Sequence, residues 1–230
     1  MKFKLLFLVT FFTCIGFSQD DIDKEELYKN YREDQFYASV TYNLLNEKPQ
    51  GMSQKGFSTG FHFGFIRDMP INQKRDFAIG LGLGLSGNNY NQDMLITESD
   101  RNYSFNLIEN DISFTTNKIE TFLVEIPLEI RWRTSTAVDY SFWRVYAGVK
   151  LGYLLYNTAK FKSDDVANVK LSNIDAFEKL QYGLTLSAGY GTWNFHVYYG
   201  LNPIFKSFSE LDGSSIDMKS LKIGLMFYIL

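Results

Sequence analysis

Seven charged side chains and both histidines of this 230-residue chain fall on alternate positions that otherwise carry small or polar residues. The charged residues are Glu125, Glu129, Arg131, Arg144, Lys150, Lys179 and Lys222, and the histidines are His62 and His196. Carboxylates and cations that are withdrawn from water must pair with each other. A histidine beside a nucleophile can act as a general base. The set therefore offers either structural charge pairing or acid–base catalysis.

Apart from Lys179, which directly precedes the sixth of them, these positions belong to eight segments in which apolar and polar residues alternate. The segments cover residues 36–44, 57–65, 77–85, 122–132, 143–155, 180–190, 193–201 and 221–229. Successive residues of a β-strand point to opposite faces of a sheet, so this period of two predicts strands with one apolar face. Aromatic residues make up 17% of the chain and only 4 residues are proline, which also favours strands.

The connections between these segments alternate between long and short. The longest polar stretches cover residues 87–119 and 157–177, whereas 68–76, 134–141 and 191–192 are short. An antiparallel meander that closes on itself has this arrangement, with long loops at one end, short turns at the other and no unpaired edge. The sequence thus predicts an all-β protein with an eight-stranded antiparallel up-and-down barrel.

The residues of the polar face indicate whether the apolar face points to the interior or to the exterior of the barrel. A soluble barrel exposes charged and hydroxyl residues to water, but the third segment offers Gly80, Gly82 and Gly84, which suit a crowded interior. Aromatic residues lie near the ends of the apolar faces, as in the girdles at the two interfaces of membrane barrels. The predicted girdle comprises Phe122, Trp132, Trp143, Tyr153, Tyr182, Tyr190 and Trp193. These features predict a transmembrane barrel whose apolar face contacts outer-membrane lipid.

The N-terminal segment has the pattern of an export signal. Residues 1–18 combine Lys2 and Lys4 with an apolar run and end at Ser18, which predicts a cleaved signal peptide. Residues 19–35 then form an acidic periplasmic leader, and the barrel occupies 36–230. The single cysteine, Cys14, lies within the signal, so no disulfide is expected. We expect a bacterial outer-membrane location with the long loops outside the cell.

The interior of an eight-stranded barrel limits the functions that are open to it. Such a barrel is filled by its own side chains, whereas porins with aqueous channels need about 16 to 18 strands. We therefore interpret the charged set as a structural plug, and a gated ion path or partner site is the alternative. The histidines could serve a lipid-modifying enzyme, but neither lies in a recognisable serine motif, so no catalytic residue is predicted. No cofactor or metal is implied.

Four segments resemble known outer-membrane barrels. VEIPLEIRWR (124–133) and RVYAGVKLGYLL (144–155) are similar to the outer-membrane β-barrels of Bacteroidota. REDQFYASVTYNLL (32–45) and GFHFGFIRDMPIN (60–72) resemble the PorT-like members, which are required for type IX secretion and associated with gliding motility. The resemblance implies a non-enzymatic accessory or assembly component of that system, with no catalytic residues to carry over.

Partner expectations follow from charge and from this resemblance. The formal net charge of −3 argues against a nucleic-acid partner, since phosphate binding requires a basic surplus. Membrane lipid and other type IX secretion components are the expected partners of a monomeric barrel. A surface-exposed adhesion or envelope-stabilising barrel, and a lipid-modifying enzyme, remain alternatives.

Overall fold

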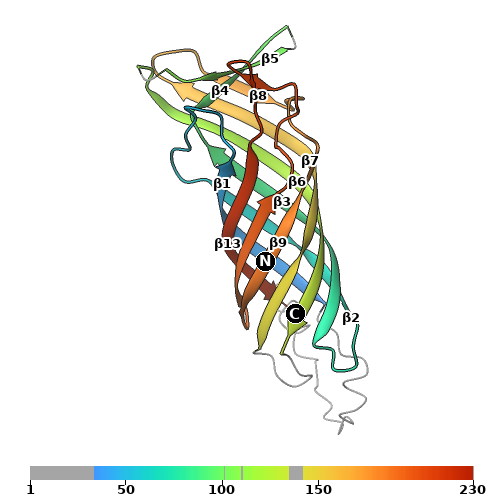
Figure 1. Cartoon of the computed structure of the whole chain (residues 1–230). Coiled ribbons are helices and arrows are strands. Elements are labelled where there is room, and N and C mark those ends of the chain that lie inside the picture. Colours follow the sequence, from blue (N-terminus) through green and yellow to red (C-terminus); the bar gives the residue numbers. More distant parts are fainter. Residues whose placement is uncertain (1–33, 101, 110, 135–141, 230) are drawn as a thin grey trace, which may run out of the picture. The chain divides into compact units, whose positions relative to one another are not determined.

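A computed structural model describes residues 34–100, 102–109, 111–134 and 142–229. Eight strands form the barrel (Figure 1): β1 (Gln35–Asn46), β2 (Thr59–Pro70), β3 (Phe77–Asn91), β6 (Phe114–Arg133), β7 (Trp143–Ser163), β9 (Leu180–Tyr190), β10 (Trp193–Gly200) and β13 (Lys219–Ile229). Each pairs antiparallel with the next, and β13 pairs with β1. The predicted all-β, eight-stranded antiparallel barrel is confirmed. The signal peptide and nearly all of the leader lie outside the described residues.

The period-two pattern of the sequence is also the pattern of burial. Along β9 the side chains alternate strictly between exposed and buried up to Ala188, and β2 and β7 do the same over most of their length. The exposed members are mostly apolar and the buried members are mostly polar or glycine, which is the reverse of a water-soluble barrel. Within the described residues, no helix is long and apolar enough to cross a membrane.

The seven residues of the predicted aromatic girdle all lie on the outer face. Trp132, Trp143, Tyr190 and Trp193 gather at the short-turn end, where the Trp143 and Tyr190 rings lie 5.5 Å apart. Phe122, Tyr153 and Tyr182 lie toward the other end of the apolar band. We expect these two groups to mark the two membrane interfaces.

The three glycines of β3 make room for large luminal side chains. A Cβ atom on Gly80 would lie 2.7 Å from the Arg131 side chain. A Cβ on Gly84 would meet the Tyr37 hydroxyl and would lie 2.7 Å from the Phe63 carbonyl oxygen. The glycine run is thus the small-residue complement of the Arg and Tyr side chains that fill the lumen.

Gly84→Ala is expected to destabilise the barrel by about 1 to 3 kcal/mol, because an added methyl overpacks a filled interior. The measurement is denaturant unfolding of the protein in lipid vesicles. Gly87→Ala is the matched control, since its Cβ would face outward and come no closer than 4.0 Å to Phe122. Equal stability of the two variants would contradict this account of the glycines.

The predicted long loops contain strands that the sequence analysis missed. Both β6 and β7 run past the aromatic residues, and β4 (Met94–Ser99), β5 (Asn102–Leu107) and β8 (Val169–Ser172) accompany them. A bulge after Phe122 leaves Leu155 unpaired on β7, so the inward and outward positions of that strand exchange beyond it. The alternation of apolar and polar residues therefore changes phase at Leu155 in the sequence, although β7 continues to Ser163. Two short strands, β11 (Glu210–Leu211) and β12 (Ser214–Ser215), complete this end.

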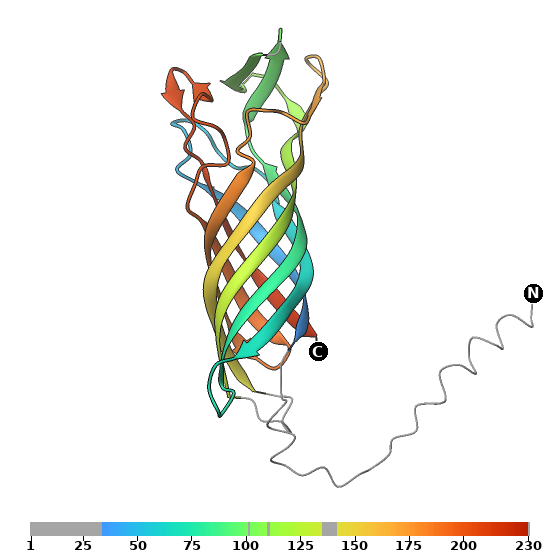
Figure 2. The same cartoon turned by 90° about the vertical axis from the view of Figure 1, so that its right-hand side faces the viewer.

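An apolar core closes the long-loop end of the barrel. It includes Leu45, Tyr90, Met94, Phe105, Ile119, Leu123, Phe177, Phe205, Ile216 and Met218. The Phe177 and Phe205 rings lie 4.5 Å apart, and Phe105 packs edge-on against Phe205 at 5.3 Å. Figures 1 and 2 show the loops and short strands gathered at this end, opposite the β2–β3 turn. We name this apolar core, with the loops that form it, the cap.

Candidate functional site

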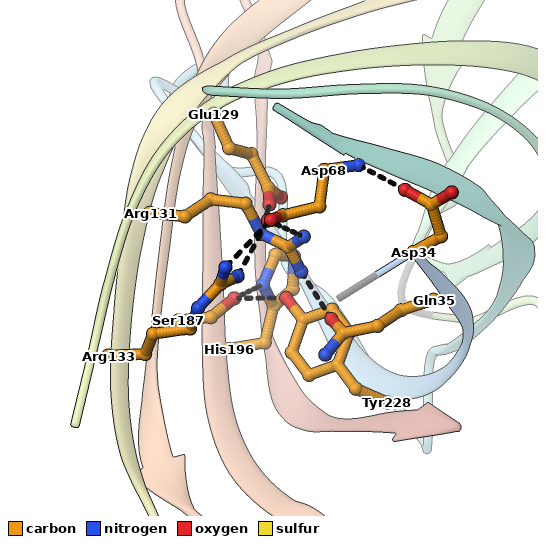
Figure 3. A network of polar contacts seen from close by, with 9 residues as sticks. All are labelled: Asp34, Gln35, Asp68, Glu129, Arg131, Arg133, Ser187, His196 and Tyr228. Atoms are coloured by element: carbon orange, nitrogen blue, oxygen red, sulfur yellow. Dashed lines mark hydrogen bonds and ion pairs between the residues drawn. The ribbon is translucent and has the colours of Figure 1, made fainter. Parts of the chain in front are cut away.

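The most extensive ionic network of the lumen joins β2 to β6 near the short-turn end. Asp68 lies near the end of β2 and accepts two hydrogen bonds from Arg133. Arg133 Nη1 donates to Asp68 Oδ1 at 2.7 Å, and Arg133 Nη2 donates to Asp68 Oδ2 at 2.8 Å. Its Oδ1 also accepts a hydrogen bond from Arg131 Nη1 at 2.9 Å. All three side chains are fully buried. Two guanidinium groups on one carboxylate, one of them bidentate, give a rigid charged cross-link (Figure 3).

Arg131 extends this network toward the axis of the barrel. Its Nη2 donates a hydrogen bond to Gln35 Oε1, and its Nε lies 3.6 Å from Glu129 Oε2. Its guanidinium also stacks 4.1 Å from the centre of the Tyr146 ring. The sequence analysis assigned Gln35 to a leader outside the barrel, but the residue is fully buried in β1. The first strand therefore starts at Gln35, one residue before the predicted Phe36. The Gln35 side chain is held inside the barrel as a hydrogen-bond acceptor for Arg131.

A second cluster lies between this network and the cap. Glu125 Oε2 accepts from Lys150 Nζ at 3.1 Å, and both carboxylate oxygens lie 3.2 Å from His62 Nδ1. Lys222 is also buried, with its Nζ 5.0 Å from the centre of the Tyr198 ring. Strands β2, β6, β7, β10 and β13 supply these side chains, so the cluster spans the lumen rather than one wall.

The structure places six of the seven predicted luminal charges in the interior. Glu125, Glu129, Arg131, Arg144, Lys150 and Lys222 are all buried. Lys179 is the correction: it is exposed and lies before β9 begins, because the strand starts only at Leu180. Two further members, Asp68 and Arg133, were missed. Arg133 continues the inward alternation of β6 by one step beyond Arg131, and Asp68 continues that of β2 by two steps beyond Gly64. This signal was hidden because the predicted strands stopped earlier.

The described lumen carries more positive than negative charge. Arg131, Arg133, Arg144, Lys150 and Lys222 are its buried cations, and Asp68, Glu125 and Glu129 are its buried carboxylates. Arg144 has no carboxylate partner among the described residues. Its guanidinium instead lies 4.4 Å from the Phe142 ring centre and 5.4 Å from that of Tyr228, where cation–π attraction partly replaces an ion pair.

The other histidine pairs with a serine that the sequence did not single out. Ser187 Oγ lies 2.7 Å from His196 Nδ1, and Tyr228 Oη donates to Ser187 Oγ at 3.4 Å (Figure 3). This spacing resembles that of a nucleophile and its base. Both side chains, however, are almost completely buried inside the lumen, so lipid in the surrounding bilayer has no route to the serine.

The residues described offer no arrangement of His, Cys, Asp and Glu side chains that could hold a metal ion. The two histidines serve separate partners, Glu125 and Ser187. Each histidine is thus engaged in a polar contact with a side chain of another strand inside the lumen. What the arrangement does chemically is to cross-link strands from inside the barrel.

Reconstituted in a planar bilayer at high salt, the wild-type protein is expected to give no stable ion current. The cap, the Glu125 cluster and the Asp68 network lie in succession along the lumen, and an eight-stranded barrel has little interior to spare. The measurement is single-channel recording, with a 16-stranded porin as the conducting control. A steady ohmic conductance would contradict the closed interior.

Comparison with known proteins identifies the domain but no individual relative. The family model described as "Outer membrane protein beta-barrel domain" matches residues 17–206. No curated protein matches the chain. Among solved structures, Ail, the attachment invasion locus protein of Yersinia pestis, is 14% identical with a TM-score of 0.38, covering 85% of this chain and 97% of that one. A complex of Ail with the heparin analogue sucrose octasulfate is also 14% identical, with a TM-score of 0.33 and coverage of 86% and 99%.

Proposed function

The chain belongs to the outer membrane protein β-barrel domain family, and from that premise we propose that it is a closed, non-enzymatic accessory of type IX protein secretion. The single observation that supports a closed barrel acting by contact is the filled interior. A lumen occupied by buried ion pairs and covered by an apolar cap leaves the outer wall, the cap and the turns as surfaces for function. Such a protein works by contact rather than by transport through its own axis.

The secretion role rests on the resemblance of residues 32–45 and 60–72 to PorT-like barrels. The described parts of these segments lie on the neighbouring strands β1 and β2 and on the turn that follows β2. They include Gln35 and Asp68, the partners of Arg131. The resemblance thus covers both the Arg131 network and an exposed turn with Ile71 on its surface, directly after β2 ends at Pro70. We propose this turn as the contact with other secretion components in the periplasm.

The proposed orientation follows from export and from strand number. A cleaved signal peptide delivers the chain to the periplasm, and an even number of strands returns its C-terminal end to the same side as β1. The short turns then face the periplasm and the cap faces the cell surface. A monomeric barrel in contact with outer-membrane lipid is the simplest assembly.

The test is deletion of the gene, followed by complementation and proteomics of the culture medium. The expected result is the joint loss of many secreted proteins that carry C-terminal sorting signals, restored by the wild-type gene. Complementation with Ile71→Asp, which changes the turn and not the barrel wall, should leave the barrel inserted but fail to restore secretion. Normal secretion in the deletion strain would overturn the proposal.

A surface-contact role is the second candidate, because β4 and β5 form a separate two-stranded sheet at the cap. Normal secretion together with altered surface binding or envelope integrity in the deletion strain would favour it. A changed lipid A mass would instead favour the lipid-modifying alternative, against which stands the burial of Ser187 and His196.

A further inference from the structure

Three lysines are aligned across neighbouring strands on the outer wall. Lys118 of β6 is directly paired with Lys160 of β7, and Lys160 is in turn paired with Lys170 of β8. Directly paired residues of antiparallel strands share a face of the sheet. The flanking residues of Lys160, Ala159 and Phe161, are buried, so the lysines point outward. We name Lys118, Lys160 and Lys170 the lysine row.

This alignment of three lysines is electrostatically unfavourable when no anion is bound to it. Like charges directly opposite each other on a sheet repel. Lys118 Nζ pairs with Glu120 Oε1 at 2.5 Å, and the other oxygen of Glu120 accepts from Thr158 Oγ1 at 3.1 Å. The ammonium groups of Lys160 and Lys170 have no ion pair within the described part of the chain, and the same is true of nearby Lys162. The row therefore has a surplus of positive charge that one carboxylate does not balance.

Acidic residues elsewhere on the β7–β8 hairpin do not cancel this surplus. Asp164 and Asp165 follow the end of β7, beyond Lys162. Asp165 Oδ2 already accepts a hydrogen bond from the Ser113 backbone N–H at 2.9 Å. The lysine row is thus left to attract an anion from outside the chain.

A groove in the outer wall leads from the apolar band toward the lysine row and ends at Glu120, the ion-pair partner of Lys118. Its lower part, about 470 Å³, is lined mainly by apolar side chains that include Val40, Phe61 and Phe227. Its upper part, about 440 Å³, shares Phe61, Gly87 and Phe122 with the lower part and continues to Glu120 and Thr158. Gly87 creates the space, because it has no side chain on the outer face where the preceding outward residues of β3, Leu83 and Leu85, are leucines.

The spacing of groove and lysines matches an amphiphile that stands in the membrane. Lys118 lies four residues beyond Phe122 on the same face of β6, so it stands roughly 10 Å above the girdle for a strand rise of about 3.3 Å and a tilt of about 40°. This is at the outer edge of the headgroup region, which extends roughly 5 to 8 Å beyond the hydrocarbon core on each side. Figure 1 shows the far ends of β6 and β7 extending beyond the rest of the barrel wall, where β8 joins β7.

We propose that this surface binds one phosphorylated lipid of the outer leaflet, with an acyl chain in the groove at Gly87 and its phosphate on the lysine row. The charge complementarity selects an anionic headgroup, and the apolar lower part of the groove selects a lipid over a free phosphate ion. The site goes beyond a secretion role but rests on the proposed orientation, with the cap at the cell surface.

The test uses the purified full-length mature protein in neutral phosphatidylcholine nanodiscs, with diphosphorylated lipid A as the probe and native mass spectrometry as the readout. Wild-type protein should retain one lipid A at saturation, and added inorganic phosphate should not displace it. Lys118→Gln/Lys160→Gln/Lys170→Gln should lower the apparent affinity at least about tenfold, as expected for losing charge-assisted contacts to phosphate. Raising the salt concentration should weaken wild-type binding, since exposed charges are screened.

Two further variants make the outcome decisive. Lys48→Gln/Lys55→Gln/Lys74→Gln removes the same charge from exposed lysines elsewhere and should bind like wild type. Gly87→Leu fills the groove and should weaken lipid A binding with the lysine row intact. Equal affinity of wild type and the lysine-row variant, or equal losses in both triple variants, would overturn the site. Displacement of lipid A by inorganic phosphate would overturn the acyl-chain part. These in vitro results are independent of the secretion assay, so the two proposals can fail separately.

Discussion

Val149→Arg is expected to lower the stability of the membrane-inserted barrel by about 2 to 4 kcal/mol, the cost of placing a lipid-facing arginine near the bilayer midplane. Val149 lies midway along the apolar band of β7, is exposed, and pairs with Leu128 and Leu184 on the neighbouring strands. All three side chains face outward, so the arginine would have no polar neighbour at that depth. Reversible urea unfolding in lipid vesicles measures the change, and loss of heat-modifiable migration reports failed insertion.

Thr116→Arg is the matched control for this prediction. Thr116 is an outward residue of β6 near Lys118 and the β8 hairpin, six positions beyond Phe122 and outside the apolar band. The same side chain added there should stay in water and leave stability nearly unchanged. If both variants insert and unfold alike, the apolar face does not contact lipid, and the assignment of inside and outside would be wrong.

Asp68→Asn is expected to lower the stability by about 3 to 5 kcal/mol, because removing one partner of a buried ionic network leaves the remaining charges uncompensated. Asp68 provides carboxylate oxygens to both Arg131 and Arg133, and all three side chains are shielded from water. Asparagine has nearly the same shape, so the loss would report charge and hydrogen bonding rather than packing. The measurement is again reversible unfolding in vesicles.

Asp175→Asn provides the comparison for a carboxylate in water. Its hydrogen bond from Lys206, at 3.0 Å, lowers the pKa of the Asp175 carboxyl, but the residue is exposed in the cap and its ion pair is solvated. Little change in stability is expected. A second variant, Asp68→Asn/Arg133→Gln, removes one of the orphaned guanidinium groups and should recover part of the lost stability. No loss in Asp68→Asn would show that the network does not hold the barrel together.

The sequence determined the barrel wall because each wall residue follows a local rule. Successive side chains of a strand point to opposite faces. Because one face contacts lipid and the other a crowded lumen, apolar and polar or small residues alternate along the sequence. That period revealed the strands, the outward girdle positions such as Trp143, and the inward placement of Glu125 and Lys150. Lys179 was misplaced because the rule holds only inside a strand, and β9 begins one residue later.

Only the tertiary structure decided what the inward residues meet and how the barrel ends. Asp68 and Arg133 are far apart in sequence, and their bidentate pairing depends on the registers of β2, β3 and β6 together. The bulge after Phe122 reversed the faces of β7, so the lysine row and the cap could not be derived from alternation that had already broken. Alternation is a property of one strand, whereas ion pairs, cap packing and the groove at Gly87 arise between strands, where register and closure choose the partners.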